Sequence, residues 1–523
     1  MSQKPLSQSA RKNNILAARI IAQTVKTTLG PKGMDKVLVD DQGNITITND
    51  GATILSEMSV EHPIARMIVE IAQTQELEVG DGTTSAVILA GELLKNADDL
   101  LDKKIHPTII AQGYGLATTF CLQELESLAT SVEVTDTKTL IQIAKTAMTG
   151  KSASSAKEIL AQLCVDALTH VSQTSQNHIE DITILTQPSG LVSQSRVEPG
   201  IIIDKAPLHG ATMQVDNPKI ALLTSPIELR QSETDTRIQI TNPNQMQSFL
   251  EQEESLIKQM VETLQTQGVT AVFTTKGIDE LAQHYLQKAS IAAFRRVKVS
   301  DMQKLAKATN ARIVNSLSDL QQSYLGDAKH IKVSQIQGEL YTFIQDTPNR
   351  VGATILLHAS TRHVVDELKR AVEDALGDLC AVLRAKKIVY GAGAIELSLA
   401  KKVKEFAQTQ SGKEQLAILA FAQSLEVIPA TIAENAGLDP IDVLTQLRLE
   451  HEKHHYSKGI DVLKGVLDAK EEGVLEPMLV KHRAITSACE VANVILRIDD
   501  VIYCGPITED ELAQARKQLE QSK

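Results

Sequence analysis

The stretch Glu78–Ala86 reads Glu-Val-Gly-Asp-Gly-Thr-Thr-Ser-Ala and joins two glycines to an aspartate and three hydroxyl side chains. Glycine lets a backbone approach a ligand closely because it has no Cβ. An apolar helical pattern begins at Val87, and a helix that starts here offers unpaired amides and its positive dipole end to a phosphate. Asp81 adds a hard oxygen ligand of the kind that Mg²⁺ takes beside phosphate oxygens. Alone, the stretch indicates a phosphate site and a capped helix start about equally.

Two more glycine loops precede this stretch, and each also carries an aspartate at the boundary of an expected element. Residues 29–36 read Leu-Gly-Pro-Lys-Gly-Met-Asp-Lys and follow a helical pattern over residues 13–29. Residues 49–53 read Asn-Asp-Gly-Ala-Thr and follow a hairpin expected for residues 37–48. The three loops together favour the phosphate interpretation.

Three short motif matches do not carry chemistry. Residues 149–152, Thr-Gly-Lys-Ser, end like a Walker A loop, but Lys145 stands where the first glycine of that motif belongs. Residues 451–455 fit the zinc-protease pattern H-E-x-x-H, yet so short a pattern arises by chance, and Gly459 soon afterwards suits a helix end. Residues 391–393, Gly-Ala-Gly, resemble part of a dinucleotide fingerprint but follow a helix instead of opening a first βα unit.

Composition narrows the class of protein. A chain of 523 residues suggests about three domains, and 42% hydrophobic with 23% charged residues can bury ample apolar surface. Aromatic residues make up only 3% and tryptophan is absent, which argues against stacking on single-stranded nucleic acid. A formal net charge of −12 argues against a general polyphosphate-binding surface. We therefore expect no nucleic-acid partner.

The cysteines and the N-terminus predict a cytoplasmic protein. Five cysteines are scattered with no C-x-x-C pair, which is typical of reduced thiols. The first residues, Met-Ser-Gln-Lys-Pro, lack the apolar segment of a signal peptide, and no run is expected to reach the length of a membrane span. We expect no membrane partner.

The expected secondary structure changes twice along the chain. Helical patterns are expected over residues 83–130, 139–172 and 364–387, and the chain is mostly helical again after residue 391. Between them lie short β-like runs, expected at 182–185, 201–203, 220–223, 269–273, 298–299, 313–314 and 331–333. Helix-rich ends around an α/β middle predict a domain inserted in a domain, with hinges near residues 137, 204, 356 and 391.

One helix in the middle region carries an unusual apolar stripe. It is expected to start at Pro243, after the polar stretch of residues 231–236. The stripe consists of Met246, Phe249, Leu250, Ile257, Met260, Val261 and Leu264. We expect Met246, Phe249 and Leu250 to project as an exposed tip, and Met260, Val261 and Leu264 to pack inward.

Several motifs occur together in one order. The three glycine loops are followed by Val-Glu-Asp-Ala-Leu at 372–376, Gly-Ala-Gly at 391–393 and Gly-Val-Leu-Glu-Pro at 473–477. Residues 234–254 and Ile-Leu-Arg-Ile-Asp-Asp at 495–500 add to the set. Over essentially the whole chain this combination resembles the group II chaperonins, the archaeal thermosome and eukaryotic cytosolic type.

The resemblance implies a multidomain α and α/β subunit of a double-ring ATPase that encloses unfolded polypeptide. An equatorial ATP-binding domain would comprise residues 1–137 and 392–523, and an intermediate domain residues 138–203 and 357–391. Residues 204–356 would form an inserted α/β apical domain, with a helical protrusion at about 231–262 that acts as a lid and touches clients. Partners would be unfolded polypeptides and like or related subunits.

The resemblance also implies ATP and Mg²⁺ as ligands and assigns site residues by motif. The catalytic residues would be Asp374, which would activate the attacking water, Lys151, which would sense the γ-phosphate, and Asp50, on the γ side. Asp81 would hold Mg²⁺, and Glu476 would lie near the ribose. The remaining positions would contact the nucleotide: Gly30, Pro31, Asn49, Gly51, Gly82, Thr83, Thr84, Ser85, Gly391, Ala392 and Gly393.

The chemistry of phosphoryl transfer agrees with this set, because that reaction needs positioning and charge neutralisation more than covalent help. Two plainer interpretations stand beside it. Asp374 could be a solvated helix charge with Arg370 one turn back, and Lys151 an ordinary surface lysine. Ala392 and Tyr390 depart from the usual glycine and proline of the family, and His-Ala-Ser at 358–360 replaces Arg-Gly-Gly.

Two functions of different classes share this fold. The leading hypothesis is an ATP-driven folding chamber. The alternative is a slowly hydrolysing ring that acts as a scaffold or holdase. Three carboxylates, Asp50, Asp81 and Asp374, around one phosphate site favour hydrolysis. A small-molecule kinase would need a second substrate pocket that the sequence does not indicate.

Overall fold

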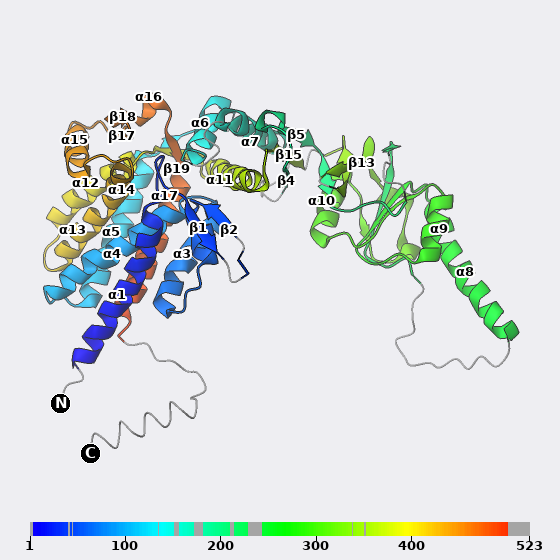
Figure 1. Ribbon diagram of the computed structural model, residues 1–523, viewed down its shortest axis with the longest axis horizontal. Coiled ribbons are helices and arrows are strands. Elements are labelled where there is room, and N and C mark those ends of the chain that lie inside the picture. Colours follow the sequence, from blue (N-terminus) through cyan, green and yellow to red (C-terminus); the bar gives the residue numbers. More distant parts are fainter. Residues whose placement is uncertain are drawn as a thin grey trace, which may run out of the picture.

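A computed structural model describes residues 4–39, 42–43, 45–133, 135–150, 156–171, 181–209, 214–228, 243–336, 338–349 and 352–499. In the helices over residues 4–10, 243–246 and 248–250 it describes the backbone alone. Figure 1 shows an elongated molecule, with a helical bundle at one end, a mixed α/β unit at the other and a smaller unit between them.

The bundle is built from both halves of the chain around one hydrophobic core, which runs from Ile15 to Leu125 and from Val389 to Leu496. Helix α4 lies at its centre and packs against α1, α3, α13 and α17. The bundle's helices are α1 (Lys4–Lys26), α2 (Gly51–Glu57), α3 (Pro63–Val79), α4 (Thr83–Asp102), α5 (Pro107–Leu128), α12 (Ala394–Thr409), α13 (Glu414–Leu425), α14 (Val427–Asn435), α15 (Pro440–Glu452) and α17 (Met478–Arg497).

Short strands join the two halves of the chain at the bundle. The antiparallel sheet β19-β16-β3 pairs Leu475–Pro477 with Lys387–Tyr390 and Thr130–Ser131. Two hairpins, β1-β2 (Lys36–Val39 and Ile45–Thr48) and β17-β18 (Lys458–Asp461 and Gly465–Asp468), lie beside it, followed by the short α16 (Ala469–Glu472). The first hairpin confirms the hairpin expected for residues 37–48.

The smaller unit has its own hydrophobic core, formed by residues from Leu140 to Ile182 and from Ala353 to Ile388, with Leu475. The long helix α11 packs against α6 and α7 and against the sheet β4-β15-β5. Its elements are α6 (Thr137–Ala147), α7 (Lys157–Val171), β4 (Ile182–Gln187), β5 (Arg196–Pro199), β15 (Ala353–His358) and α11 (Arg362–Ala385), with a 3₁₀ turn at Val192–Gln194.

The far unit contains two sheets. The parallel strands β10-β9-β8-β11, with β12 antiparallel to β8, form one, and the antiparallel strands β6-β14-β13-β7 form the other. Their bounds are β6 (Ile201–Ile203), β7 (Gln214–Asp216), β8 (Lys219–Leu223), β9 (Ala271–Thr274), β10 (Ala292–Phe294), β11 (Ile313–Val314), β12 (Gly326–Asp327), β13 (His330–Ile336) and β14 (Glu339–Gln345). The helices are α8 (Pro243–Thr266), α9 (Glu280–Lys288) and α10 (Val299–Thr309), with 3₁₀ turns at Leu317–Asp319 and Gln322–Tyr324.

The second half of helix α8 packs inward, as its apolar stripe predicts. Val261 and Leu264 are buried and Met260 is half-buried against the same core, which confirms inward packing. Ile257, which lies between the two parts of the stripe, is also fully buried. The side chains of Met246, Phe249 and Leu250 lie outside the described residues. The described first half of the helix extends away from the sheets (Figure 1).

Two other expectations are wrong. The strand expected at residues 298–299 is the start of α10, because Val299 is exposed and the buried strand β10 has already ended at Phe294. The stretch Glu414–Asn435 is long and apolar enough to cross a membrane, although no such run was expected. Its helices α13 and α14 pack against α4 and α12 inside the bundle, and 61% of its most apolar window is buried, which explains the apolar composition as core packing.

Candidate nucleotide site

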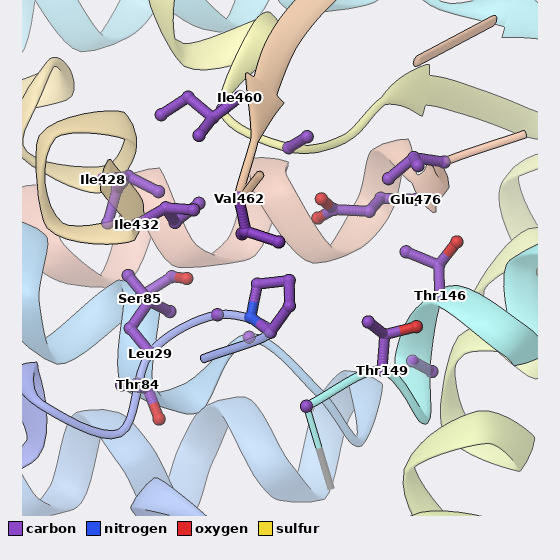
Figure 2. A pocket seen from close by; sticks show the side chains of 18 of the residues that line it. Leu29, Thr84, Ser85, Thr146, Thr149, Ile428, Ile432, Ile460, Val462 and Glu476 are labelled. Atoms are coloured by element: carbon purple, nitrogen blue, oxygen red, sulfur yellow. The ribbon is translucent and has the colours of Figure 1, made fainter. Parts of the chain in front are cut away.

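A cavity of about 610 Å³ lies where the three glycine loops meet. That volume suits a small-molecule ligand such as a nucleotide. Figure 2 shows its lining side chains converging from elements that are distant in sequence. Of the residues singled out from the sequence, the following line it: Gly30, Pro31, Asn49, Asp50, Gly51, Asp81, Gly82, Thr83, Thr84, Ser85, Ala392, Gly393 and Glu476.

The N-terminus of α4 opens beside this cavity. Gly82 is the N-cap with φ of +79°, and no side chain caps the helix. A Cβ at Gly82 would stand 2.7 Å from Val480 Cγ1, so only glycine fits this turn without a shift. The first amide bonded within the helix is that of Ala86, which donates to Gly82 O. The amides of the first turn are therefore available to an anion in the cavity.

Asp81 and Asp50 bring their carboxylates to the same cavity in different ways. Asp81 Oδ1 accepts a hydrogen bond from the Gly82 amide at 2.7 Å. Asp50 is the N-cap of α2, and its Oδ2 accepts from the Thr53 amide at 2.8 Å. Each carboxylate thus has one oxygen fixed by backbone, which leaves the other oxygen for a cation.

The second glycine loop is braced on both sides. Asn49 Nδ2 donates to Gly150 O at 2.7 Å. Gly51 lies so close to α4 that an added Cβ would stand 2.3 Å from Thr84 Oγ1. The loop is thus held between the residues before α7 and the start of α4.

Two polar residues that the sequence analysis missed hold the other loops. Asn435 Nδ2 donates to Lys26 O at 3.0 Å and to Leu29 O at 2.8 Å, and so ties α14 to the loop at Gly30. Gln75 is buried, and its Nε2 donates to Asp81 O at 2.9 Å and to Val480 O at 3.2 Å. The sequence could have indicated Gln75, because it is a polar residue on the otherwise buried face of α3. Nothing in the sequence singled out Asn435, which is the last residue of the apolar helix α14.

The opposite wall of the cavity is apolar and was also missed. Ile428 and Ile432 come from α14, and Ile460 and Val462 from the β17-β18 hairpin (Figure 2). These elements meet only through the tertiary fold. An apolar slot facing a phosphate-binding helix end fits the base of a nucleotide.

The turn at residues 391–393 forms part of the same wall. Ala392 has φ of +57°, a left-handed conformation that is strained for alanine, and its carbonyl accepts a hydrogen bond from the Ile460 amide at 2.9 Å. Ala392 and Gly393 line the cavity, whereas Gly391 is not among the lining residues and lies against Glu476. The methyl group of Ala392 is tolerated because Gly459 lies opposite, where a Cβ would come within 3.0 Å of it.

Glu476 is a partly exposed carboxylate in the cavity wall and pairs with Lys481 at 2.5 Å. Burial raises the pKa of Glu476 above its ordinary value, and the nearby charge of Glu396 adds to the shift, while Lys481 opposes it. Lys481 also lines the cavity.

Asp374 is buried on α11 and is not among the residues that line the cavity. One turn further along α11, Gly377 touches Gly80 at the start of the Asp81 loop. Asp374 therefore lies near this loop but outside the cavity wall. Lys151 lies outside the described residues.

The H-E-x-x-H match is structural. Helix α15 ends at Glu452, so His451 and His455 do not share a helical face. His451 is buried with both ring nitrogens occupied, Nδ1 by Ser398 Oγ at 3.2 Å and Nε2 by Lys458 O at 2.8 Å. His455 pairs with Glu450. This arrangement supports the rejection of a zinc site.

The residues present fit a nucleoside triphosphate with a divalent cation. The uncapped start of α4 suits phosphate, Asp50 and Asp81 supply oxygen ligands, and the isoleucine wall suits a base. The family model of the TCP-1/cpn60 chaperonins matches residues 21–506. The chain belongs to this family.

Relatives of this chaperonin chain cover nearly its whole length. A thermosome subunit of Methanopyrus kandleri is 49% identical over 97% of the chain and 94% of its own length. Thermosome subunit beta of Methanothermobacter thermautotrophicus is 51% identical over 95% and 92%, and thermosome subunit alpha of Archaeoglobus fulgidus is 48% identical over 98% and 95%. These comparisons confirm a group II chaperonin subunit, an ATP-dependent chaperone of the double-ring type.

Proposed function

We propose that this chaperonin subunit hydrolyses Mg²⁺-ATP in the cavity and that hydrolysis drives closure of the ring over unfolded polypeptide. The observation that carries the proposal is the convergence of three glycine loops, with Asp50 and Asp81, on the uncapped start of α4. Backbone amides and carboxylates in this arrangement serve phosphoryl transfer, where positioning and charge neutralisation supply most of the catalysis.

The phosphates would bind at the first turn of α4. The amides and hydroxyls of Thr83, Thr84 and Ser85 would donate to phosphate oxygens, and Gly30 and Pro31 would cover them from the other side. Asp81 would hold Mg²⁺, with Asp50 and the Asn49–Gly51 turn on the γ side. When bound, Mg²⁺ supplies positive charge that neutralises the phosphate oxygens.

Asp374 and Lys151 would complete hydrolysis. Asp374 would orient the attacking water through its carboxylate, and Lys151 would contact the γ-phosphate. Because Asp374 is outside the cavity wall, we propose that α11 shifts toward the Asp81 loop when ATP binds, about the contact of Gly377 with Gly80.

The nucleoside would lie toward the other end of the cavity. The apolar wall formed by Ile428, Ile432, Ile460 and Val462 would receive the base. Ala392 and Gly393, with Gly391 behind them, would shape the turn beside it, and Glu476 would accept hydrogen bonds from the ribose.

The three units of the molecule support the proposed division of labour. An equatorial domain of residues 1–137 and 392–523 would contain the bundle, and an intermediate domain of residues 138–203 and 357–391 would transmit the motion. An apical domain of residues 204–356 would bind clients, with the protrusion at about 231–262 as a lid. The described units differ slightly from these bounds, because β6 (Ile201–Ile203) belongs to the far unit and β15 (Ala353–His358) to the smaller unit. Like or related subunits would complete each ring, and we expect a cytoplasmic location.

The position of Asp374 favours one alternative. A catalytic carboxylate outside the cavity wall suits a ring that hydrolyses slowly and acts as a scaffold or holdase. The test is phosphate release by the purified protein with Mg²⁺-ATP, combined with electron microscopy with and without ATP. Turnover with ATP-dependent ring closure supports the folding chamber, whereas an ATP-bound ring without turnover supports the alternative.

A further inference from the structure

A buried cluster of three charged side chains supports one corner of the cavity. Lys481 Nζ lies 2.8 Å from Glu396 Oε1 and 2.5 Å from Glu476 Oε2. The side chains of Lys481 and Glu396 are 10% and 6% exposed, and that of Glu476 is 21% exposed. Lys481 comes from α17, Glu396 from α12 and Glu476 from β19. The cluster therefore forms only when α12 packs beside β19 and α17, which follow it by about 80 residues.

The cluster holds one positive and two negative charges. Burial by itself would lower the pKa of Lys481, but the carboxylates of Glu396 and Glu476 outweigh it and raise that pKa. Glu396 Oε2 is buried, and none of the described residues gives it a hydrogen-bond partner. Lys481 is thus the group that offsets both carboxylates, and removing it would leave two like charges buried side by side.

The geometry leaves one oxygen of Glu476 for a ligand. Oε2 is taken by Lys481, whereas Oε1 lies against the Gly391 turn, where an added Cβ would stand 2.4 Å from it. Figure 2 shows the carboxylate directed into the cavity. An ionised carboxylate accepts hydrogen bonds and cannot donate them, so this oxygen matches a hydroxyl and repels a phosphate.

We propose that Lys481, anchored by Glu396, is a positioning residue that holds the Glu476 carboxylate directed at a ribose hydroxyl, and so makes the cavity select ribonucleotides over deoxyribonucleotides. The proposal rests on the proposed function, since it assumes a nucleoside triphosphate in this cavity. A hydrogen bond to a charged acceptor is strong enough to give about tenfold discrimination.

The test measures dissociation constants of ATP, 2′-deoxy-ATP and 3′-deoxy-ATP for the assembled full-length protein with Mg²⁺. The variants are Lys481→Met, Glu476→Gln and, as a matched control, Lys401→Met. Lys401 is also on the bundle and 12% exposed, and it pairs with Glu452 at 3.1 Å, but it does not line the nucleotide cavity.

Wild type and the Lys401→Met control should prefer ATP over at least one deoxy analogue by about tenfold. In Lys481→Met this preference should fall below about threefold. The reason is that ATP should bind more weakly, whereas the affinity for the deoxy analogue that the wild type disfavours should change little. A general loss of stability would instead weaken all three ligands together, and that result would overturn the proposal.

Should Lys481→Met fail to assemble, the double variant Glu396→Gln with Lys481→Met removes the two supporting charges together and is expected to lose the preference equally. A wild-type preference in either variant overturns the positioning role, as does a wild type without any preference. Loss of preference in Glu476→Gln alone would leave the proposed function standing and reject the role of Lys481. Failure of the wild type to bind ATP would instead reject the proposed function.

Discussion

Gly80 and Gly377 touch across two units of the molecule, and a Cβ on either residue would stand 2.9 Å from the Cα of the other. Gly80 precedes Asp81, and Gly377 is one turn beyond Asp374 on α11. The contact therefore sets how closely the helix that carries the proposed catalytic carboxylate approaches the proposed metal ligand.

Replacing Gly377 with alanine should force these two backbones apart, because neither atom in the contact is a flexible side-chain end. We expect ATP hydrolysis to fall at least tenfold, in line with the sensitivity of catalysis to small displacements. The control is Gly115→Ala on α5, where an added Cβ meets nothing within 4 Å. Phosphate release by Gly377→Ala at the rate of this control would show that the contact does not govern catalysis.

The variants Asp374→Ala and Asp81→Ala should lose different steps, the first hydrolysis and the second nucleotide binding. Asp374→Ala removes the group proposed to orient water, so ATP binding and ring assembly should persist while hydrolysis falls about a hundredfold. Asp81→Ala should weaken the binding of Mg²⁺-ATP itself. Equilibrium titration and phosphate release separate the two effects.

The control for Asp374 is Asp366→Ala on the same helix, where the carboxylate is 47% exposed and lies 4.0 Å from Arg362. Near-normal hydrolysis by Asp374→Ala would remove this residue from the mechanism.

Ala392 should be replaceable by glycine with a small gain in stability. The left-handed conformation costs an alanine about 1 kcal/mol or more, whereas the added freedom of glycine in the unfolded chain costs about 0.5–1 kcal/mol. Ala394→Gly, two residues on in α12, is the control and should destabilise by about 1 kcal/mol. Urea unfolding at one protein concentration compares them, and an equal loss in both variants would contradict strain at Ala392.

The sequence predicted the phosphate end of the site better than the nucleoside end. Loops such as Gly80–Gly82 and Asn49–Gly51 are contiguous in the chain and carry their chemistry in residue type, so order and spacing were sufficient to find them. The wall made by Ile428, Ile432 and Ile460 consists of ordinary apolar residues, which acquire a role only when α14 and the β17-β18 hairpin meet across the cavity.

The sequence analysis missed the buried polar side chains that hold the site together for a related reason. Gln75 and Lys481 lie among the buried residues of amphipathic helices, and sequence alone does not reveal which partner each one finds. For Lys298–Val299 the error was of another kind, because two residues carry no period and an exposed helix start resembles a short strand. The hairpin at residues 36–48, with several alternating positions, was predicted correctly.

His451 should make stability depend on pH. Burial lowers the pKa of His451, with the positive charge of Lys401 in the same direction, while the hydrogen bond to Lys458 O and the charge of Glu450 oppose the shift. A histidine with a lowered pKa in the folded state stabilises the fold above its unfolded pKa of about 6.5. As the pH falls below that value the unfolded chain takes up the proton first, so the stabilisation is lost.

We therefore expect the free energy of unfolding to fall by up to about 1.4 kcal/mol per pH unit below pH 6.5 through this group, until the folded pKa is reached. His451→Gln should lower stability at pH 7.5, where the neutral ring bonds Ser398 and Lys458, but should flatten the decline between pH 6.5 and 5. The control is His454→Asn, because His454 is exposed and nearby. His454 has a left-handed backbone conformation that asparagine also adopts, so this variant should leave the decline unchanged. Urea unfolding across this pH range measures all three proteins. Parallel curves for wild type and His451→Gln would show that the acid sensitivity arises from other groups.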